Sequence, residues 1–411
     1  MSEGLRSRLD SPLVSYYLVL GSTMALTIVG LVMVLSSSSI EALRLHGNSF
    51  SVFTRQVLFA ALAVPLVVLA VKMPVSAWKA VSWPLLVSAV LGLLLVLTPL
   101  GKGVHGNRNW LEIAGMRLQP SEFAKLALVI WAATVLARKR KLLEQTVHVV
   151  VPVVFPVAML LVGLVLLGHD LGTAMVLMAL AAALLWVAGT PARLFLGGLA
   201  LAVTATGIAL ASPNKTRLAR IEVWLSRACE DMSNYHSTCW QSVHAKWALA
   251  SGGWWGVGLG GSREKWSYLP EAHNDFIFAI IGEELGLTGT LVVLVLFAVL
   301  GVGLLRVVAR SRDPFVKIAT GGVLAWVLGQ AIINIGAVLG LLPVIGVPLP
   351  LVSSGGSALV TTLVALGMVI GFARREPGVP EALAARVGVV RRSLAVLPGR
   401  RPANRRTGGT R

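Results

Sequence analysis

The chain has 411 residues, of which 56% are hydrophobic and only 13% are charged, and its mean hydropathy is +0.79. Soluble domains carry about 25% charged residues, so this composition argues against a soluble globular protein. The net charge of +18 would suit nucleic acid, but the cations lie mostly in a C-terminal tail and between apolar segments, a placement typical of membrane proteins that face anionic lipid.

Apolar runs of about 20 residues recur along the chain, the length that crosses about 30 Å of hydrocarbon. They lie at 15–36, 53–72, 79–99, 120–137, 147–167, 172–190, 193–211, 276–308, 318–339 and 358–373. The sequence therefore predicts an all-α, polytopic membrane protein with about ten transmembrane helices. The first run is too long for the apolar core of a secretory signal, and we interpret it as the first span.

An even number of spans places both termini on one side of the membrane. With the N-terminus inside, the cation-rich loops at 138–141 and 306–317 are cytoplasmic, as the positive-inside rule requires. The sequence then predicts a cytoplasmic segment at 1–14, a transmembrane domain at 15–373 and a basic, disordered cytoplasmic tail at 374–411. We expect the tail to bind anionic lipid or cytoplasmic division proteins.

The predicted large extracytoplasmic loop, 212–274, lies between spans seven and eight. It contains both cysteines of the chain, Cys229 and Cys239, which form a candidate disulfide because such bonds persist outside the cell; two free thiols are the alternative. The next run, 276–308, is too long for a simple crossing and carries Glu283 and Glu284 among glycines. We expect a break in that helix or an extension above the membrane.

Polar residues near a bilayer are costly and usually functional, and most of them fall on the predicted outer side. They cluster at His105–Trp110, Gln119–Lys125, His169–Thr173, Gly252–Gly261, Tyr268–Phe276 and Leu342–Ser357. Glu122 and Lys125 are three residues apart, so they share a helix face and can form an ion pair. That pair either contacts substrate or is purely structural.

These outer segments combine acids with cations. The acids Asp170, Glu271 and Asp275 suit a general base. The cations suit a phosphorylated substrate; they are Arg108, Lys125, Arg217, Arg220, Lys246, Arg263 and Lys265. His273 beside Asp275 would suit a metal, but we predict no metal site and leave a divalent cation open. Residue types alone do not separate an enzyme from a lipid-phosphate transporter.

Several of these motifs resemble those of the FtsW/RodA (SEDS) family of peptidoglycan polymerases. The resemblance covers about 15–373 and is most specific at Leu269–Ala279, Glu283–Gly286 and Asn334–Ala358; Gln119–Lys125 and Asp170–Thr173 also match. Leu269–Glu284 and Met33–Ser39 are more similar to the division branch, FtsW, than to the elongation branch, RodA. The resemblance implies a glycosyltransferase of the cytoplasmic membrane that joins lipid II units at the division septum.

The resemblance also implies roles for individual residues. Asp275 is the expected catalytic base, with undecaprenyl pyrophosphate as the leaving group. The expected substrate-binding residues are Arg108, Glu122, Lys125, Asp170, Lys246, Glu271, His273, Ser353 and Ser357. The implied partners are a class B penicillin-binding transpeptidase and other divisome proteins, and no cofactor is certain.

The chain departs from the family pattern at four places. Asn274 stands where Thr is common, His169 where Pro is common, and Ser354 where Tyr is common. Arg108 is displaced by one residue relative to Trp110, which leaves its role open. The alternative functions are a lipid II flippase, which moves the same substrate, and a noncatalytic divisome scaffold.

Overall fold

The computed structural model describes residues 13–104, 107–113, 115–142, 156–193, 195 and 239–385. Eight of the helices in these ranges are long and apolar enough to cross a membrane. They are α2 (Leu13–His46), α3 (Ser51–Lys72), α4 (Val75–Leu97), α5 (Pro120–Arg138), α8 (Leu171–Ala188), α12 (Ile277–Arg310), α13 (Pro314–Val338) and α14 (Gly356–Ala373). Shorter elements are η1 (Arg140–Leu142), α7 (Met159–Leu167) and α11 (Trp240–Gly252).

The eight long helices match eight of the predicted spans, so the all-α polytopic fold is confirmed. The largest difference is α2, which continues ten residues past the predicted end at 36, through the polar segment that ends at His46. Of the other two predicted spans, 147–167 is described only from residue 156 and contains α7. The span 193–211 lies almost entirely outside the described residues.

Local sequence signals explain where several helices begin and end. The Asp170 carboxylate accepts from Thr173 N at 3.0 Å and caps α8, while Asp313 accepts from Phe315 N at 2.8 Å and caps α13. Proline occupies the first turn of α5 and of α13, where its missing N–H costs nothing. Gly189 ends α8 in the left-handed conformation.

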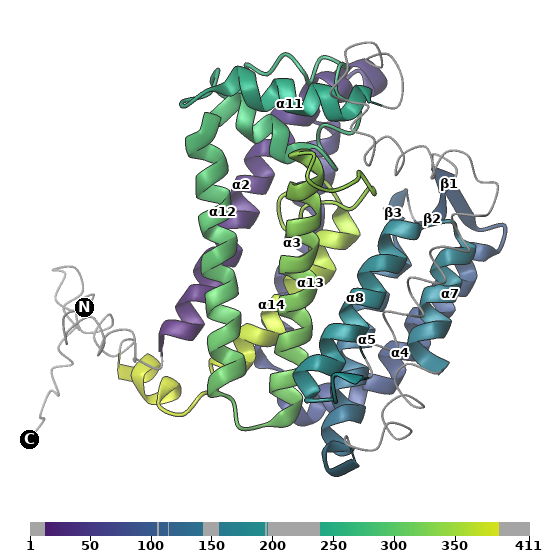
Figure 1. Ribbon diagram of the computed structural model, residues 1–411, viewed down its shortest axis with the longest axis vertical. Helices are drawn as coiled ribbons and strands as arrows, with labels where there is room; N and C mark the ends of the chain where they lie inside the picture. Colours follow the sequence, from purple (N-terminus) through teal and green to yellow (C-terminus); the bar gives the residue numbers. More distant parts are fainter. Residues whose placement is uncertain are drawn as a thin grey trace, which may run out of the picture.

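The helices differ in how much of their surface is enclosed by protein. The apolar window of α5 is 78% buried and that of α14 is 72% buried, whereas the window of α3 is only 17% buried. Because a bilayer solvates apolar side chains as well as a protein core does, we interpret α3 as lipid-facing and α5 as central. Figure 1 shows α5, α8, α13 and α14 running side by side through the middle of the bundle.

A three-stranded antiparallel sheet at one end of the bundle was not predicted. It consists of β1 (Gly101–Val104), β2 (Asn107–Ile113) and β3 (Met116–Leu118), in the order β1-β2-β3. Leu111 pairs with Gly101 on one side and Leu118 on the other, and a bulge follows Lys102. The strands are too short for their alternation to stand out beside the apolar runs. Figure 1 places the sheet at the same end as α11, which we call the α11 end.

The predicted break in the 276–308 segment is confirmed. Within α12, Gly286 has φ 68° and ψ −165°, a conformation outside the helical region that only glycine adopts readily. The chain following α11 crosses here: a β-carbon on Gly256 would lie 2.2 Å from Glu284 O, and one on Gly286 would lie 2.4 Å from Gly256 N. Glycine therefore allows two backbones to touch at the break.

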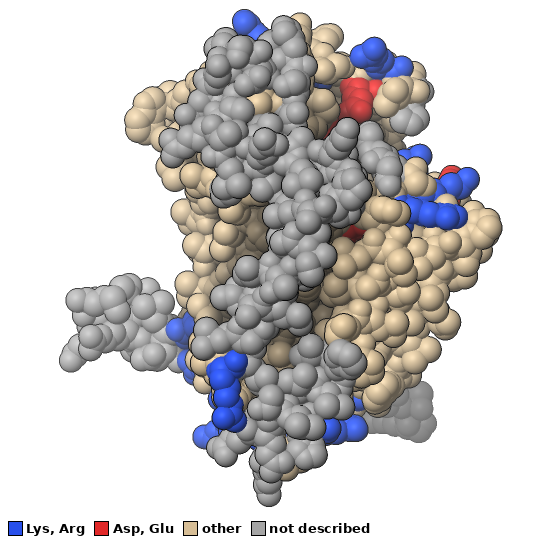
Figure 2. Space-filling model, turned by 45° about the vertical axis from the view of Figure 1, so that its right-hand side comes forward, with Lys and Arg blue, Asp and Glu red and all other residues tan. Residues whose placement is uncertain are grey.

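Charge lies toward the ends of the molecule. On the face drawn in Figure 2, Lys and Arg gather near the two ends, and the band between them is mostly uncharged. At the end opposite α11, Arg310 Nε lies 3.3 Å from Glu376 Oε2, and Lys79 Nζ lies 3.1 Å from Asp313 Oδ2. Residues 374–385 of the predicted tail form turns and a short helical segment at this end, and the rest lies outside the described residues.

Candidate active site

Asp275 lies in a tight turn just before α12 begins at Ile277, at the α11 end. Asn274 N and Phe276 N both donate to Glu271 O, at 3.0 and 3.3 Å, and Glu271 itself has a positive φ of 56°. The Glu271 carboxylate accepts from the Asn274 side chain. This turn fixes the backbone at Asp275, whose side chain is half-buried.

A second segment, residues 343–353, holds this turn from the other side. Asn334 of α13 donates from Nδ2 to Asp275 O and to Val347 O, each at 2.8 Å. The Ser353 hydroxyl donates to Asn274 O at 2.6 Å and accepts from Leu349 N at 2.8 Å. Two loops that are 70 residues apart in the sequence are therefore joined at Asp275.

Asp275 lines a small pocket together with α13 and the 343–353 segment. Asn334, Ile345, Gly346 and Val347 form its walls beside the carboxylate. Gly346 has φ +72°, and a β-carbon placed there would lie 3.6 Å from Asp275 Oδ2. The carboxylate thus faces a stretch of backbone that bears no side chain.

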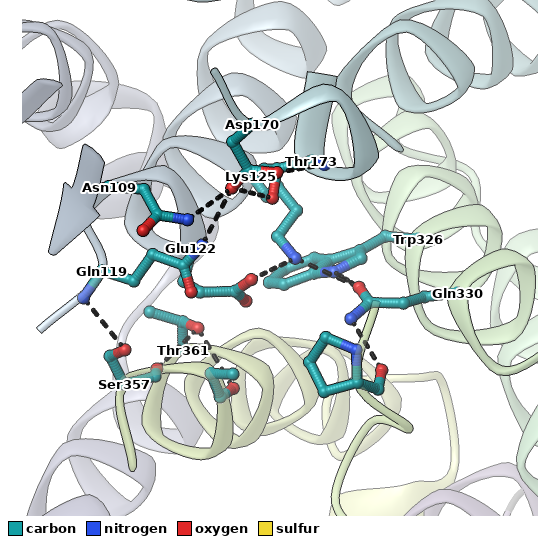
Figure 3. A network of polar contacts seen from close by, with 12 residues as sticks. Asn109, Gln119, Glu122, Lys125, Asp170, Thr173, Trp326, Gln330, Ser357 and Thr361 are labelled. Atoms are coloured by element: carbon teal, nitrogen blue, oxygen red, sulfur yellow. Dashed lines mark hydrogen bonds and ion pairs between the residues drawn. The ribbon is translucent and has the colours of Figure 1, made fainter. Parts of the chain in front are cut away.

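The predicted Glu122–Lys125 ion pair is confirmed, and it is buried. Lys125 Nζ lies 2.8 Å from Glu122 Oε1, and the two side chains are 2% and 3% exposed (Figure 3). Nζ also donates to Gln330 Oε1 at 3.1 Å and lies 5.1 Å from the centre of the Trp326 ring. Glu122 Oε2 has no hydrogen-bond partner among the described residues.

Helix α13 connects this ion pair with Asp275. Gln330 Oε1 accepts a hydrogen bond from the Lys125 ammonium, and Gln330 Nε2 donates one to Pro348 O at 3.0 Å. Asn334 follows one turn later on the same face of the helix and binds Asp275 O. Gln330 and Asn334 were not among the predicted site residues, although two amides four residues apart in an apolar span are a signal for them.

The Asp170 carboxylate accepts several hydrogen bonds from other parts of the protein, so we interpret it as a structural residue and not as a substrate contact (Figure 3). Besides capping α8, its Oδ2 accepts from Thr173 Oγ1 at 2.8 Å, Asn109 Nδ2 at 2.9 Å and Gln119 Nε2 at 3.2 Å. The side chain is 7% exposed. It therefore ties β2 and the start of α5 to α8.

The remaining predicted substrate-binding residues lie around the α11 end in different settings. The Arg108 guanidinium donates to Thr98 O at 2.6 Å, and Ser357 Oγ accepts from Gln119 N at 3.1 Å. His273 Nδ1 lies 3.2 Å from Glu41 Oε2. Lys246 is exposed on α11, and its ammonium would lie 3.4 Å from a β-carbon on Gly340, just past α13. Arg217 and Arg220, which the sequence offered only as further outer cations, lie outside the described residues.

Comparison with known proteins identifies the family. A family model described as "Cell cycle protein", that of FtsW, RodA and SpoVE, matches residues 16–377. The chain belongs to this family.

Two curated relatives and one solved structure illustrate the similarity. The probable peptidoglycan glycosyltransferase FtsW of Mycobacterium tuberculosis is 39% identical over 378 residues, covering 92% of this chain and 71% of the relative. The protein of the same name from Geobacter metallireducens is 35% identical over 366 residues, covering 88% and 95%. A chain from a peptidoglycan synthase complex, solved to show structural coordination of polymerization and crosslinking, aligns with a TM-score of 0.72 at 26% identity, covering 88% of this chain and 98% of that one.

This FtsW/RodA/SpoVE family member also has a buried charge cluster where α12 breaks. Lys265 Nζ lies 2.9 Å from Glu284 Oε1, with both side chains at most 2% exposed, and Ser36 of α2 donates to Glu284 Oε2 at 2.5 Å. Glu283 accepts from Arg263 N at 2.8 Å and from the Ser262 hydroxyl. The two adjacent glutamates therefore bind residues 262–265, in the loop that leads to Asp275, to α12. Lys265 and Arg263 were predicted only as outer cations; the structure shows that Lys265 is buried in an ion pair and that Arg263 binds Glu283 through its backbone N–H.

His244 of α11 forms a second titratable contact in the same loop. Its Nδ1 lies 2.5 Å from Glu264 Oε2, and its ring stacks with Trp240 and Tyr268 at centroid distances of 4.2 and 6.0 Å. Burial raises the pKa of Glu264, although the hydrogen bond to His244 opposes the shift. The neighbouring Cys239 is disulfide-bonded. Its pairing with Cys229 stays a prediction, since Cys229 lies outside the described residues.

No metal centre is evident in the described part of the family member. No group of three or more His, Cys, Asp or Glu side chains there is arranged to hold an ion. His273 and Asp275 are close in sequence, but His273 lies against Glu41. A divalent cation stays a prediction from the sequence alone.

Proposed function

We infer that this multi-pass membrane protein is a peptidoglycan glycosyltransferase, which polymerises lipid II into glycan strands. Its relatives in the family carry the name probable peptidoglycan glycosyltransferase FtsW. The observation that carries the catalytic assignment is the setting of Asp275. It is a half-buried carboxylate on a fixed backbone, beside a pocket wall with no side chain at Gly346.

In the proposed mechanism, Asp275 is the general base. Its carboxylate accepts the proton of the acceptor's sugar hydroxyl while that oxygen attacks the anomeric carbon of the donor. The bond from this carbon to the diphosphate breaks, and undecaprenyl pyrophosphate leaves with the electron pair. The proton remains on Asp275 until it returns to solvent. A positioned base of this kind contributes about 10²–10⁴-fold to the rate.

Lys246 is the cation that we assign to direct contact with the diphosphate. It is exposed, and it lies beside Gly340, directly after the turn of α13 that supplies Ala337 and Val338 to the Asp275 pocket. A cation there would stabilise the charge that develops on the leaving group. Lys125 is enclosed by its partners, so we assign it to fixing α5 against α13 behind the site.

The position of the buried charges favours catalysis over transport. Glu122 and Lys125 lie in the first two turns of α5, next to the α11 end, and the Lys265–Glu284 cluster lies beside the loop that leads to Asp275. The Arg310–Glu376 and Lys79–Asp313 pairs lie at the opposite end of the bundle. A transporter would be expected to carry polar groups to the bilayer midplane. We therefore rank the lipid II flippase and the noncatalytic scaffold below the polymerase.

We further propose that a class B penicillin-binding transpeptidase is the partner, and that the α11 end faces the outside of the cytoplasmic membrane at the septum. The similarity to a chain of a complex that coordinates polymerization and crosslinking supports a transpeptidase. The cation-rich loops at the opposite end support the orientation. Other divisome proteins and anionic lipid at the tail stay proposals on the sequence alone.

Polymerisation of lipid II by purified protein tests the proposal. The full chain, with its transpeptidase partner, should make glycan strands, and Asp275→Asn should lower the rate by about 10²-fold or more because the base is lost. Glu112→Gln is the matched control: it removes an exposed carboxylate of β2 at the same end and should leave the rate unchanged.

Each failure has a distinct meaning. An active Asp275→Asn variant would show that Asp275 is not the base. If the wild type makes no polymer but moves lipid II across vesicles, the protein is a flippase. If Asp275→Asn makes no polymer in the purified system and still supports division normally in cells, the scaffold role is correct.

A further inference from the structure

Two neighbouring tryptophans directly after α11 are strongly exposed. Trp254 is 69% exposed and Trp255 is 81% exposed, and Val257 and Leu259 beside them are 48% and 60% exposed. Such a cluster is unfavourable in water, because burial of large apolar side chains is a main source of stability. We call these four residues the tryptophan patch.

The backbone of the patch is attached to α12 immediately after its break. Leu287 N donates to Gly253 O at 2.9 Å, and Thr288 N donates to Trp254 O at 3.3 Å. These donors are the first N–H groups of the helical segment that follows Gly286. The start of the patch therefore lies at the depth of Leu287, whereas Val257, whose N donates to Glu283 O at 2.9 Å, lies beside the residues before the break.

The length of α12 fixes that depth relative to the membrane. Leu287, Leu291 and Val295 are exposed apolar residues, as expected for a lipid-facing surface. From Leu287 to Arg306, near the opposite end of α12, there are 19 residues, which span about 29 Å at 1.5 Å per residue. The hydrocarbon core is about 30 Å thick. With Arg306 at one boundary, the other boundary falls at Leu287.

We propose that the tryptophan patch is a lipid-binding surface, which inserts between the headgroups and acyl chains of the leaflet at the α11 end. Tryptophan is enriched at this depth because its ring is apolar and its N–H is polar. The patch is continuous with the lipid-facing surface of α12, which identifies lipid as the occupant. In the orientation proposed above, this leaflet is the outer one, and Asp275 lies beyond it, before the start of α12.

Tryptophan fluorescence of the whole protein in phospholipid vesicles tests the surface. The double variant Trp254→Phe/Trp255→Phe keeps aromatic side chains, so the emission of the wild type minus that of the variant reports on these two residues. We expect lipids brominated near the headgroup end of their acyl chains to quench about half or more of this difference emission, because interfacial indoles contact that region. Aqueous iodide should quench it weakly.

Trp266→Phe supplies the matched control. Trp266 is 62% exposed in the same loop but precedes Ser267, whose hydroxyl accepts from the Arg44 guanidinium in the last turn of α2, beyond the apolar run that ends at 36. Its difference emission should respond to iodide and not to brominated lipid. The proposal is overturned if iodide, and not brominated lipid, quenches Trp254 and Trp255 in vesicles. Relief of that iodide quenching by added transpeptidase would assign the patch to a protein partner instead.

Discussion

Asn334 supports the proposed catalytic residue without contacting its carboxylate. Its side-chain amide donates hydrogen bonds to the backbone carbonyls of Asp275 and Val347, and these two residues line the same pocket. Asn334 is 3% exposed, so its amide is the group that satisfies these two carbonyls inside the protein. The position of Asp275 thus depends on a side chain that the motif around Asp275 does not contain.

We expect Asn334→Leu to lower the polymerisation rate while leaving the protein folded. The two freed carbonyls cost about 1–3 kcal/mol each if they stay unpaired, and the pocket wall at Val347 is no longer fixed to Asp275. The rate with lipid II and the thermal unfolding midpoint should both be measured. Thr134→Val removes a buried hydroxyl that bonds only to Ile130 O of its own helix, and it should leave the rate intact.

The Glu122–Lys125 pair permits a test of structural against functional roles. Glu122→Gln leaves the Lys125 ammonium buried without its counter-charge, which costs about 3–5 kcal/mol of stability. The double variant Glu122→Gln/Lys125→Met removes both charges and should recover most of that loss. Recovery of the unfolding midpoint together with the polymerisation rate would establish a structural pair, whereas stability without activity would assign the charges to the reaction.

Several residue-level predictions could be made from the sequence because the partners are close in the chain. The Glu122–Lys125 pair follows from helical spacing. The role of Asp170 does not, because two of its donors, Asn109 and Gln119, are side chains that only the folded sheet and the start of α5 bring near it. The same reason applies to Ser36, whose contacts with Lys265 and Glu284 join residues more than 200 positions apart.

Whole helices were easier to predict than the connections between them. A span needs only an apolar run of sufficient length, and each of the eight long helices has one. The sheet at Gly101–Leu118 depends instead on pairing between short strands, and the extension of α2 to His46 depends on packing against the outer loop. Tertiary contacts, which the sequence pattern does not display, decide both.

The junction of α12 and α14 at the end opposite α11 should make stability depend on pH. Burial raises the pKa of Glu376 from 4.5 to about 6, although Arg310 and Arg306 oppose the shift. The folded protein then holds the proton more tightly than the unfolded chain. Stability should therefore fall as pH rises from about 4.5 to about 6, by about 2 kcal/mol at most, and stay at the lower value above that range.

Glu376→Gln should remove this dependence, because the amide is neutral at every pH. The unfolding midpoint of the wild type in detergent should drop between about pH 4.5 and pH 6, and that of the variant should drop less. Glu381→Gln changes an exposed carboxylate five positions further along and should behave as the wild type. Equal pH slopes in all three proteins would contradict the prediction.

For the whole molecule, the two ends of the bundle have different charge patterns, and this sets the proposed orientation. Alkaline phosphatase fused after Ser49, between α2 and α3, should be active because that loop faces outside. The same enzyme fused after Arg140, beyond α5, should be inactive because that loop is cytoplasmic. The opposite pattern of activity would invert the topology and place Asp275 on the cytoplasmic side.

The left-handed backbone at Gly346 restricts how this protein can evolve resistance. An inhibitor that sits against Asp275 would rest on the Gly346 backbone, where any other residue must adopt φ +72° and place its β-carbon 3.6 Å from the carboxylate oxygen. A resistance mutation at Gly346 would therefore strain the backbone of the loop, and it would also place a side chain against the Asp275 carboxylate. Drug-resistant variants should therefore arise at the neighbouring wall residues, such as Ile345, before they arise at Gly346.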